Sequence, residues 1–176
     1  MGINFKILFT LALLFNLSNL YAAGKAAQYV DEDNVNNNKS KQIIGKTEPV
    51  IIYPGNVLLE ARIDTGANTT SLDAQNLQII NEDGVDWAIF SLNGELVKHK
   101  IIKFVRIKQH GSESLRRPVI KLKVTLGDIT QVVKVTLTNR SNFKYRMLIG
   151  INFLYDHFVV DVSQNDITKP SKEVQP

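Results

Sequence analysis

Residues 61–67 read Ala-Arg-Ile-Asp-Thr-Gly-Ala and place an acidic side chain where an apolar strand runs into a turn. Residues 57–63 predict that strand because apolar side chains dominate them and they lead directly into Asp64. Thr65 and Gly66 suit a tight turn that exposes the Asp64 carboxylate while their hydroxyl and backbone N–H groups hold it. Asp and Gly are ordinary turn residues, so the triplet taken alone also fits a simple strand-end turn.

A second stretch, residues 146–150 (Arg-Met-Leu-Ile-Gly), has the pattern of an apolar strand that ends in glycine. A short helix is expected directly after Gly150, within residues 151–157, and another around residues 74–77. In the chain, the acid at a strand end comes first and the apolar strand ending in glycine follows much later.

The segments between these two stretches alternate apolar and polar side chains with a period of two, which predicts β-strands. Residues 118–126 and 129–137 alternate in phase on either side of the turn at Gly127 and Asp128, which predicts a β-hairpin. Residues 87–92 and the long stretch 96–108 show the same alternation. Short, closely spaced strands with tight turns predict an all-β barrel or sandwich.

The N-terminus has the order of a secretory signal peptide, with a basic start, an apolar run at residues 7–17 and small residues at Ala22 and Ala23. We therefore expect residues 1–23 to be removed after Ala22 or Ala23. A membrane-spanning helix needs about 20 apolar residues, so an uncleaved anchor is the weaker alternative. The mature protein is expected in a bacterial periplasm, or secreted, with no stable membrane span.

Polar composition predicts the remaining boundaries. Residues 24–48 form an acidic and Asn-rich leader with little apolar surface, although residues 41–44 could add a strand. The folded domain is expected at residues 49–163. Residues 164–176 are expected to be a flexible tail because they are polar and contain Pro170 and Pro176.

Composition also excludes several function classes. The 176 residues include no Cys, which excludes disulfides, thiolate zinc sites and a Cys nucleophile. The net charge of +4 comes without a dense Lys/Arg block, so we expect no nucleic-acid partner. His99, His110 and His157 are too far apart for a zinc-protease motif, and no phosphate-binding loop motif occurs. We therefore expect no metal site and no cofactor.

The Asp64-Thr65-Gly66 turn together with the Met147-Leu148-Ile149-Gly150 strand resembles the pair found in retroviral-type aspartic proteases. Residues 62–72 (Arg-Ile-Asp-Thr-Gly-Ala-Asn-Thr-Thr-Ser-Leu) resemble the active-site segment of the bacterial retropepsin-like family often labelled "ATP-dependent zinc protease". Residues 117–120, 135–140 and 147–150 resemble later segments of that family in the right order. One departure is Asp73, where relatives tend to have His. If that His helps define substrate choice or binds a metal in the relatives, this chain differs from them at that point.

The resemblance implies a closed retropepsin-like barrel with one short helix after the Leu-Ile-Gly strand. It implies an aspartic-type peptidase acting on a peptide or protein substrate. Because one carboxylate cannot serve as both acid and base, it also implies a homodimer that pairs two copies of Asp64. The residues implied in catalysis are Asp64, Thr65 and Gly66, and those implied in substrate binding are Ala67, His110, Gly111, Ile149 and Gly150.

A flap over the substrate is expected at the turn 109–113, and the Asn93-Gly94 turn is a rival for that role. The flanking Lys108, Arg116 and Arg117 could favour an acidic peptide, or they could simply keep a hairpin edge soluble. Relatives are associated with ATP-grasp ligases that add amino acids to carboxylates, so a glutamyl-type bond is one candidate target. The alternative function is a non-catalytic retropepsin-fold module that binds peptide or serves a partner in the cell envelope.

Overall fold

Strands dominate the structure, a computed structural model that describes residues 40–109 and 112–169. These residues lie in one unit, Ser40–Pro176. The described elements, in chain order, are β1 (Gln42–Ile44), β2 (Thr47–Tyr53), β3 (Val57–Ile63), β4 (Thr70–Asp73), β5 (Gln75–Glu82), β6 (Val85–Leu92), β7 (Glu95–Lys100), β8 (Lys103–Gln109), β9 (Ser112–Leu126), β10 (Ile129–Thr138), β11 (Met147–Ile149), α2 (Ile151–Leu154) and β12 (Phe158–Val160).

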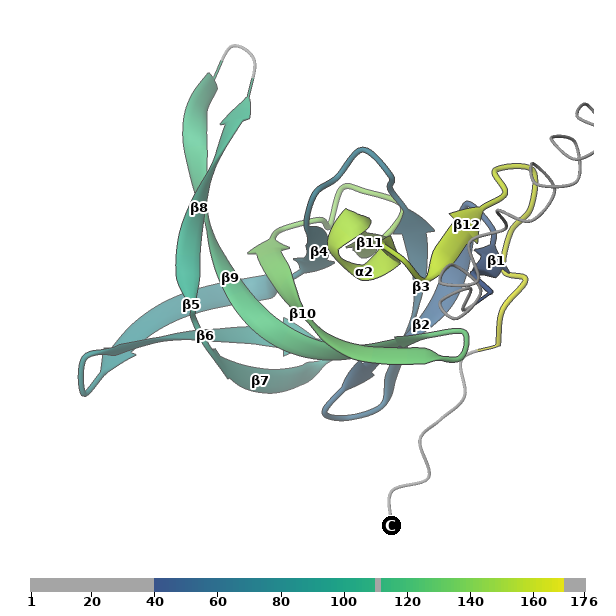
Figure 1. Ribbon diagram of the computed structural model, residues 1–176. Coiled ribbons are helices and arrows are strands. Elements are labelled where there is room, and N and C mark those ends of the chain that lie inside the picture. The colour runs from purple at the N-terminus through teal and green to yellow at the C-terminus, as the bar shows by residue number, and fades with distance from the viewer. Residues whose placement is uncertain (1–39, 110–111, 170–176) are drawn as a thin grey trace, which may run out of the picture. The chain divides into compact units, whose positions relative to one another are not determined.

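Six strands close into a barrel, in the order β10–β4–β11–β3–β2–β9 and back to β10 (Figure 1). The ring closes through the β9–β10 hairpin, whose register runs from Ile129 opposite Leu126 to Thr136 opposite Val119. Gly127 turns that hairpin with a φ of 54°, which suits glycine because it has no Cβ to clash. The all-β closed barrel, the hairpin and the short helix after Gly150 are thereby confirmed.

The inner faces of the barrel strands supply the core, because alternate side chains of each strand point to the same side. Leu72, Ile120, Leu137 and Ile149 come from four different strands, and each is 0% exposed. β3 shows the alternation directly, with Val57, Ala61 and Ile63 buried between exposed positions. The strand that leads into Asp64 is therefore anchored in the core up to its last residue.

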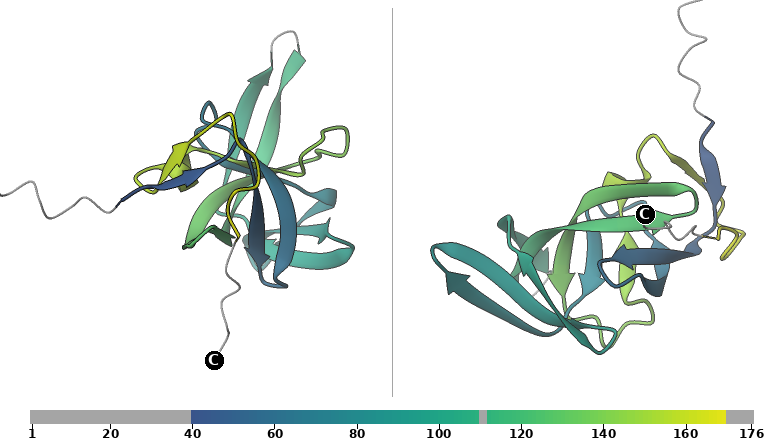
Figure 2. Two further views of the ribbon diagram at one scale, coloured as in Figure 1. Left: turned by 90° about the vertical axis from the view of Figure 1, so that its right-hand side faces the viewer. Right: turned by 90° about the horizontal axis from the view of Figure 1, so that it is seen from below.

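A separate three-stranded sheet, in the order β5–β6–β7, extends to one side of the barrel (Figure 2). The helix expected around residues 74–77 is wrong, because residues 75–82 pair with β6 as strand β5. The long stretch 96–108 is also two strands rather than one. The chain turns at Ile101, which is 7% exposed and whose N–H donates to Asp86 O at 2.9 Å.

β8 pairs with the first half of β9 outside the barrel ring, and this two-stranded arm projects from the barrel (Figure 1, Figure 2). The pairing runs from Lys103 opposite Val119 to Gln109 opposite Ser112. The expected flap residues His110 and Gly111 lie outside the described residues. The arm therefore leads to the expected flap position, whereas the Asn93-Gly94 turn belongs to the separate β5–β6–β7 sheet.

The ordered domain extends beyond the expected boundaries 49–163 on both sides. β1 and the start of β2 lie within the expected leader, and Glu48 is 0% exposed. The Glu48 carboxylate accepts hydrogen bonds from Gly45 N, from Thr168 N at 2.9 Å and from Thr168 Oγ1 at 2.7 Å. A buried carboxylate is stable only when such donors surround it. Glu48 and Thr168 are thus polar residues that the structure buries as hydrogen-bonded partners.

Among the described residues, no helix is long and apolar enough to cross a membrane.

Candidate active site

The Asp64 turn begins where β3 ends beside β11. The two strands are parallel and in register, with Ile63 opposite Ile149. The next backbone group continues the pairing, because Asp64 N donates to Ile149 O at 2.9 Å. The parallel pairing of β3 with the short apolar strand thus fixes where the acidic residue leaves the barrel.

The turn holds one oxygen of the Asp64 carboxylate in place. Gly66 N donates to Asp64 Oδ1 at 3.1 Å, and Ala67 N donates to Asp64 O at 3.2 Å. Asp64 is half-buried, whereas Thr65 and Gly66 are exposed. A carboxylate that is oriented by a backbone N–H and still open to solvent can accept a proton from water or share one with a second acid.

The backbone just after β11 also supports the turn, through hydrogen bonds to the residues that follow Asp64. Ile151 N donates to Ala67 O at 2.8 Å, and Gly150 N donates to Thr70 Oγ1 at 3.2 Å. Thr70 is in turn held by Asn152, whose Oδ1 accepts from Thr70 N at 2.8 Å and from its Oγ1 at 3.0 Å. The start of α2 and the residues after Asp64 are therefore a single hydrogen-bonded unit.

Glycine is required at position 150 by a close approach of two backbones. A Cβ there would lie 2.7 Å from Ala67 O, 2.8 Å from Thr69 C and 2.9 Å from Thr70 N. All three atoms belong to the backbone of the segment that follows Asp64, so none can move aside cheaply. The apolar strand thus ends in glycine because the active-site segment packs directly against it.

Gly150→Ala should therefore displace the Asp64 turn and lower the free energy of unfolding by about 1–3 kcal/mol, in the range of overpacked core positions. Chemical denaturation measures the stability change. Gly84→Ala is a control for steric contact alone: nothing lies within 4 Å of its Cβ position, but its φ of 77° adds a backbone strain of about 1–2 kcal/mol that must be subtracted. Equal stability of Gly150→Ala and the wild type would contradict the close packing.

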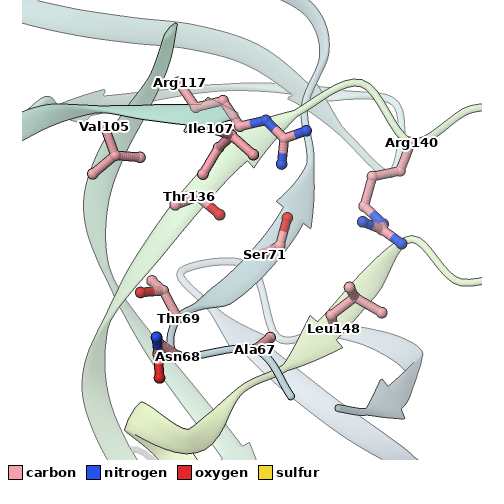
Figure 3. A pocket seen from close by; sticks show the side chains of 10 residues that line it. All are labelled: Ala67, Asn68, Thr69, Ser71, Val105, Ile107, Arg117, Thr136, Arg140 and Leu148. Atoms are coloured by element: carbon pink, nitrogen blue, oxygen red, sulfur yellow. The ribbon is translucent and has the colours of Figure 1, made fainter. Parts of the chain in front are cut away.

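A cavity of about 390 Å³ lies directly beside the turn (Figure 3). Asp64 does not line it, but the residues just after Asp64 do. The lining comes from the turn, β4, the β8–β9 arm, β10, the loop between β10 and β11, and β11 itself. The lining residues are Ala67, Asn68, Thr69, Ser71, Val105, Ile107, Arg117, Thr136, Arg140 and Leu148.

Two arginines give this cavity its charge. Burial lowers the pKa of Arg140 below its ordinary value, repulsion from Arg117 lowers it further, and attraction by Asp73 and Asp64 opposes both. Burial also lowers the pKa of Arg117. Guanidinium groups stay protonated in proteins, so the cavity keeps two positive charges. Because the Asp64 carboxylate is among the groups that raise the pKa of Arg140, the cavity lies within electrostatic range of the candidate catalytic acid.

Asp73, the departure from the family pattern, has a structural role. It is 0% exposed. Its carboxylate accepts hydrogen bonds from Arg140 N at 2.7 Å, Arg146 Nε at 3.0 Å and Gln75 Nε2 at 3.3 Å. The residue thus ties the end of β4 to the loop between β10 and β11. That loop carries Arg140 into the cavity.

The expected site residues fall into three groups. Asp64, Thr65, Gly66, Ala67 and Gly150 lie together at the turn, and Ala67 also lines the cavity. Ile149 does not face a substrate, because its side chain is 0% exposed in the core and only its backbone oxygen holds Asp64. His110 and Gly111 lie outside the described residues. The sequence interpretation did not assign Ser71, Thr136 or Arg140 to the site, although they lie within residues 62–72 and 135–140, which it compared with family segments.

The described histidines lie apart from this site. His99 in β7 stacks on Phe90, with ring centroids 6.0 Å apart, and burial lowers its pKa. His157 contacts Phe158 edge-on after α2. Within residues 40–109 and 112–169, no three His, Asp or Glu side chains gather where they could hold a metal ion.

The chain is similar to a known protein family and to several individual proteins. A family model described as "Retropepsin-like aspartic endopeptidase RimB" matches residues 43–171. A Legionella pneumophila protein of unknown function has a solved structure with a TM-score of 0.62 and 31% identity, covering 74% of this chain and 100% of that one. Two proteins named "Probable alpha-L-glutamate ligase" are also similar. The one from Shewanella pealeana is 35% identical and the one from Shewanella halifaxensis is 33% identical, each over 72% of this chain.

This chain spans only about 30% of the length of those two ligase-named relatives. The shared part is therefore one segment of a longer protein in each case. The family match, in contrast, covers residues 43–171, which include all six strands of the barrel. On the match over residues 43–171, the chain belongs to the retropepsin-like aspartic endopeptidase RimB family.

Proposed function

We propose that this protein is an aspartic-type peptidase in which the Asp64 carboxylates of two copies act together on one peptide bond. The observation that carries the proposal is the hydrogen bonding and close backbone packing around the Asp64 turn. Asp64 is oriented by Ile149 O and Gly66 N, while Gly150 packs on the backbone that follows it. Such rigid support is what a catalytic side chain needs to keep its geometry.

Two carboxylates in contact cannot both ionise, so they share one proton. The ionised Asp64 takes a proton from a water molecule, and that water attacks the carbonyl carbon of the scissile amide. The protonated Asp64 of the other copy polarises the carbonyl and gives its proton to the departing amine. The C–N bond then breaks, and the products are an acid and an amine.

Two features of the surface support a homodimer. The Thr65 side chain is exposed and makes no hydrogen bond to the described residues of its own chain, so it is free to brace a second turn. β1 and β12 form a two-stranded sheet with no further strand among the described residues. Its paired Ile43 and Val159 are 56% and 51% exposed. Open edges with apolar side chains favour pairing with another chain.

The arm made by β8 and β9 is the favoured flap. Val105 and Ile107 of β8 line the cavity together with Ala67 and Thr69 of the active-site segment. A hairpin whose base already lies against the site could close over a bound peptide and exclude water. The Asn93-Gly94 turn has no residue in the cavity lining, so it is the weaker candidate.

The second candidate is a non-catalytic module that binds peptide or serves a partner. The similarity to segments of ligase-named proteins favours this alternative, because a barrel carried within a ligase could position a substrate rather than cleave it. The relatives also make a glutamyl bond a reasonable target for the peptidase. A peptide-cleavage assay separates the two candidates.

The assay screens a peptide library at acidic and neutral pH, with a pepstatin-type inhibitor and a chelator in parallel. We expect cleavage that the inhibitor blocks and the chelator leaves unchanged. Because the site needs two copies, specific activity should fall when the protein is diluted below its dimer dissociation constant. Chelator-sensitive cleavage, or activity of a strict monomer, would contradict the proposed mechanism.

We also propose that the protein works after export, in the periplasm or outside the cell. The support is the signal-like order of residues 1–23. N-terminal sequencing of the protein recovered from cells should begin at Ala23 or Gly24. Recovery of a chain that still begins at Met1 would count against export.

A further inference from the structure

We propose that the outer face of the β8–β9 arm binds an anionic lipid surface and holds the protein at a membrane without crossing it. The outer face is made by Ile102, Phe104, Arg106 and Arg116, on the side of the arm that is turned away from the cavity. The inference is independent of the proposed peptidase, because it uses neither Asp64 nor the cavity.

The arm carries a concentration of positive charge that the rest of the chain lacks. Residues 103–117 contain five Lys or Arg residues and one Glu, which gives a net charge of +4. The whole chain also has a net charge of +4, so the charges of the remaining residues cancel. Arg106 and Arg116 are exposed and form no ion pair within the part of the chain that the structure describes, whereas Lys98 and Arg146 elsewhere each have an acidic partner.

Strand pairing puts both arginines on one side of the arm. Arg106 lies directly opposite Arg116, and Phe104 precedes Arg106 by two residues. Opposed residues of an antiparallel pair point to the same side, and that side changes at each step along a strand. The Arg116 guanidinium lies 3.7 Å from the ring centroid of Phe104, as this alternation requires. Val105 and Ile107 therefore lie on the other side, where they line the cavity.

The opposed arginines destabilise the isolated arm and would be stabilised by a negatively charged surface. Like charges directly opposite each other across an antiparallel pair repel. Lipid phosphates placed against the outer face would remove the repulsion between Arg106 and Arg116. Each guanidinium could then donate two parallel hydrogen bonds to a phosphate.

Apolar side chains beside the arginines favour a lipid surface over a soluble polyanion. Phe104 is half-buried, with its ring against the Arg116 guanidinium. Ile102 lies two residues before Phe104, its N–H donates to Val119 O at 2.9 Å, and it is 39% exposed. At a bilayer interface, apolar side chains enter the boundary between headgroups and acyl chains while basic side chains stay at the phosphates. A soluble polyanion would leave Ile102 in water.

The shape of the arm suits contact with a flat surface. β8 and the first half of β9 project from the barrel (Figure 1, Figure 2). A projecting ribbon can touch a bilayer without requiring a groove for its partner. Because the cavity lies on the opposite side of the arm, a bound lipid surface would leave the cavity open.

Sedimentation with lipid vesicles measures the binding. The anionic vesicles contain about one part phosphatidylglycerol to three parts phosphatidylcholine, and the neutral vesicles contain phosphatidylcholine alone. At low salt, we expect the protein to partition onto the anionic vesicles at least about tenfold more strongly than onto the neutral ones. High salt should reduce this difference, because screening weakens the attraction between charges. Every variant keeps the same N-terminus, so any contribution of the apolar run at residues 7–17 cancels between them.

Arg106→Gln combined with Arg116→Gln should weaken binding to the anionic vesicles by about tenfold to thirtyfold, since each basic side chain near such a surface contributes about fivefold. Lys121→Gln combined with Lys134→Gln is the matched control, because it removes an opposed pair of exposed charges from the barrel. Its effect should stay below about threefold. Ile102→Ser should weaken the same binding by about threefold or more and leave the salt dependence in place, because it removes an apolar contact.

Equal partitioning onto anionic and neutral vesicles would overturn the lipid-binding face, and so would an equal loss of binding in the arginine and lysine variants. Duplex DNA and poly-aspartate are the competing probes. Tighter, arginine-dependent binding to either of them, unchanged by Ile102→Ser, would assign the arm to a soluble polyanion and exclude the lipid surface. Asp64→Asn should bind the vesicles as the wild type does, so the absence of peptide cleavage would contradict the proposed peptidase and leave the lipid-binding face standing.

Discussion

Asp64→Asn is expected to lower kcat/KM by about a thousandfold or more, because an amide can neither ionise nor share a proton with its symmetry mate. The fold should survive the change, since Asn keeps an oxygen that can accept the 3.1 Å hydrogen bond from Gly66 N. The assay is peptide cleavage at acidic and neutral pH, with the melting temperature measured on the same samples. Cleavage that persists in this variant would exclude Asp64 as the catalyst.

Asp128→Asn is the matched control for this loss. It makes the same chemical change in the exposed turn of the β9–β10 hairpin, away from the candidate site. It should leave cleavage unchanged. Loss of activity in both variants would point to a general effect of charge rather than to catalysis.

Mixing the two proteins tests the pairing of carboxylates. Each site needs two intact copies of Asp64, so a mixed dimer should be inactive. If subunits exchange freely, an equal amount of Asp64→Asn protein should reduce the activity of a fixed amount of wild type to about one half. Activity that is indifferent to the added variant would contradict a shared site, even if Asp64 itself is essential.

The sequence predicts those parts of the fold whose determinants are local. The alternation in residues 118–126 and 129–137 with a turn between them predicts β9 and β10, because hairpin pairing depends on neighbours in the chain. The Asp64 turn and the glycine after Ile149 are likewise predictable as separate motifs. Their contact, in which Gly150 packs on Ala67 and Thr69, becomes visible only when β3 and β11 pair.

Other features depend on contacts between distant residues. Residues 75–82 form a strand because β6 pairs with them, and that pairing overrides the local preference around residues 74–77. Glu48 and Thr168 are ordinary polar residues until the fold buries them together. The cavity is the clearest case, because Ser71, Arg117 and Arg140 come from three separate segments that meet when the barrel closes.

Asp73→Ala is expected to destabilise the fold strongly, although Asp73 lies outside the Asp64 turn. The carboxylate is fully buried and accepts hydrogen bonds from Arg140 N, Arg146 Nε and Gln75 Nε2. Removing one partner of a buried ion pair costs about 3–5 kcal/mol. The Arg146 side chain is 32% exposed, so its freed guanidinium can reach water. The loss in the free energy of unfolding should therefore lie at the lower end of that range, about 3 kcal/mol.

Denaturant unfolding measures this loss, and two further variants identify its cause. Asp73→Asn keeps an acceptor for Arg140 N but turns an NH₂ group toward Arg146 Nε or Gln75, so it should lose less than Ala does. Arg146→Met in the Asp73→Ala background should recover part of the stability, because it removes the cation that lost its partner. A total loss below about 1 kcal/mol would mean that the pair is no more than a surface contact.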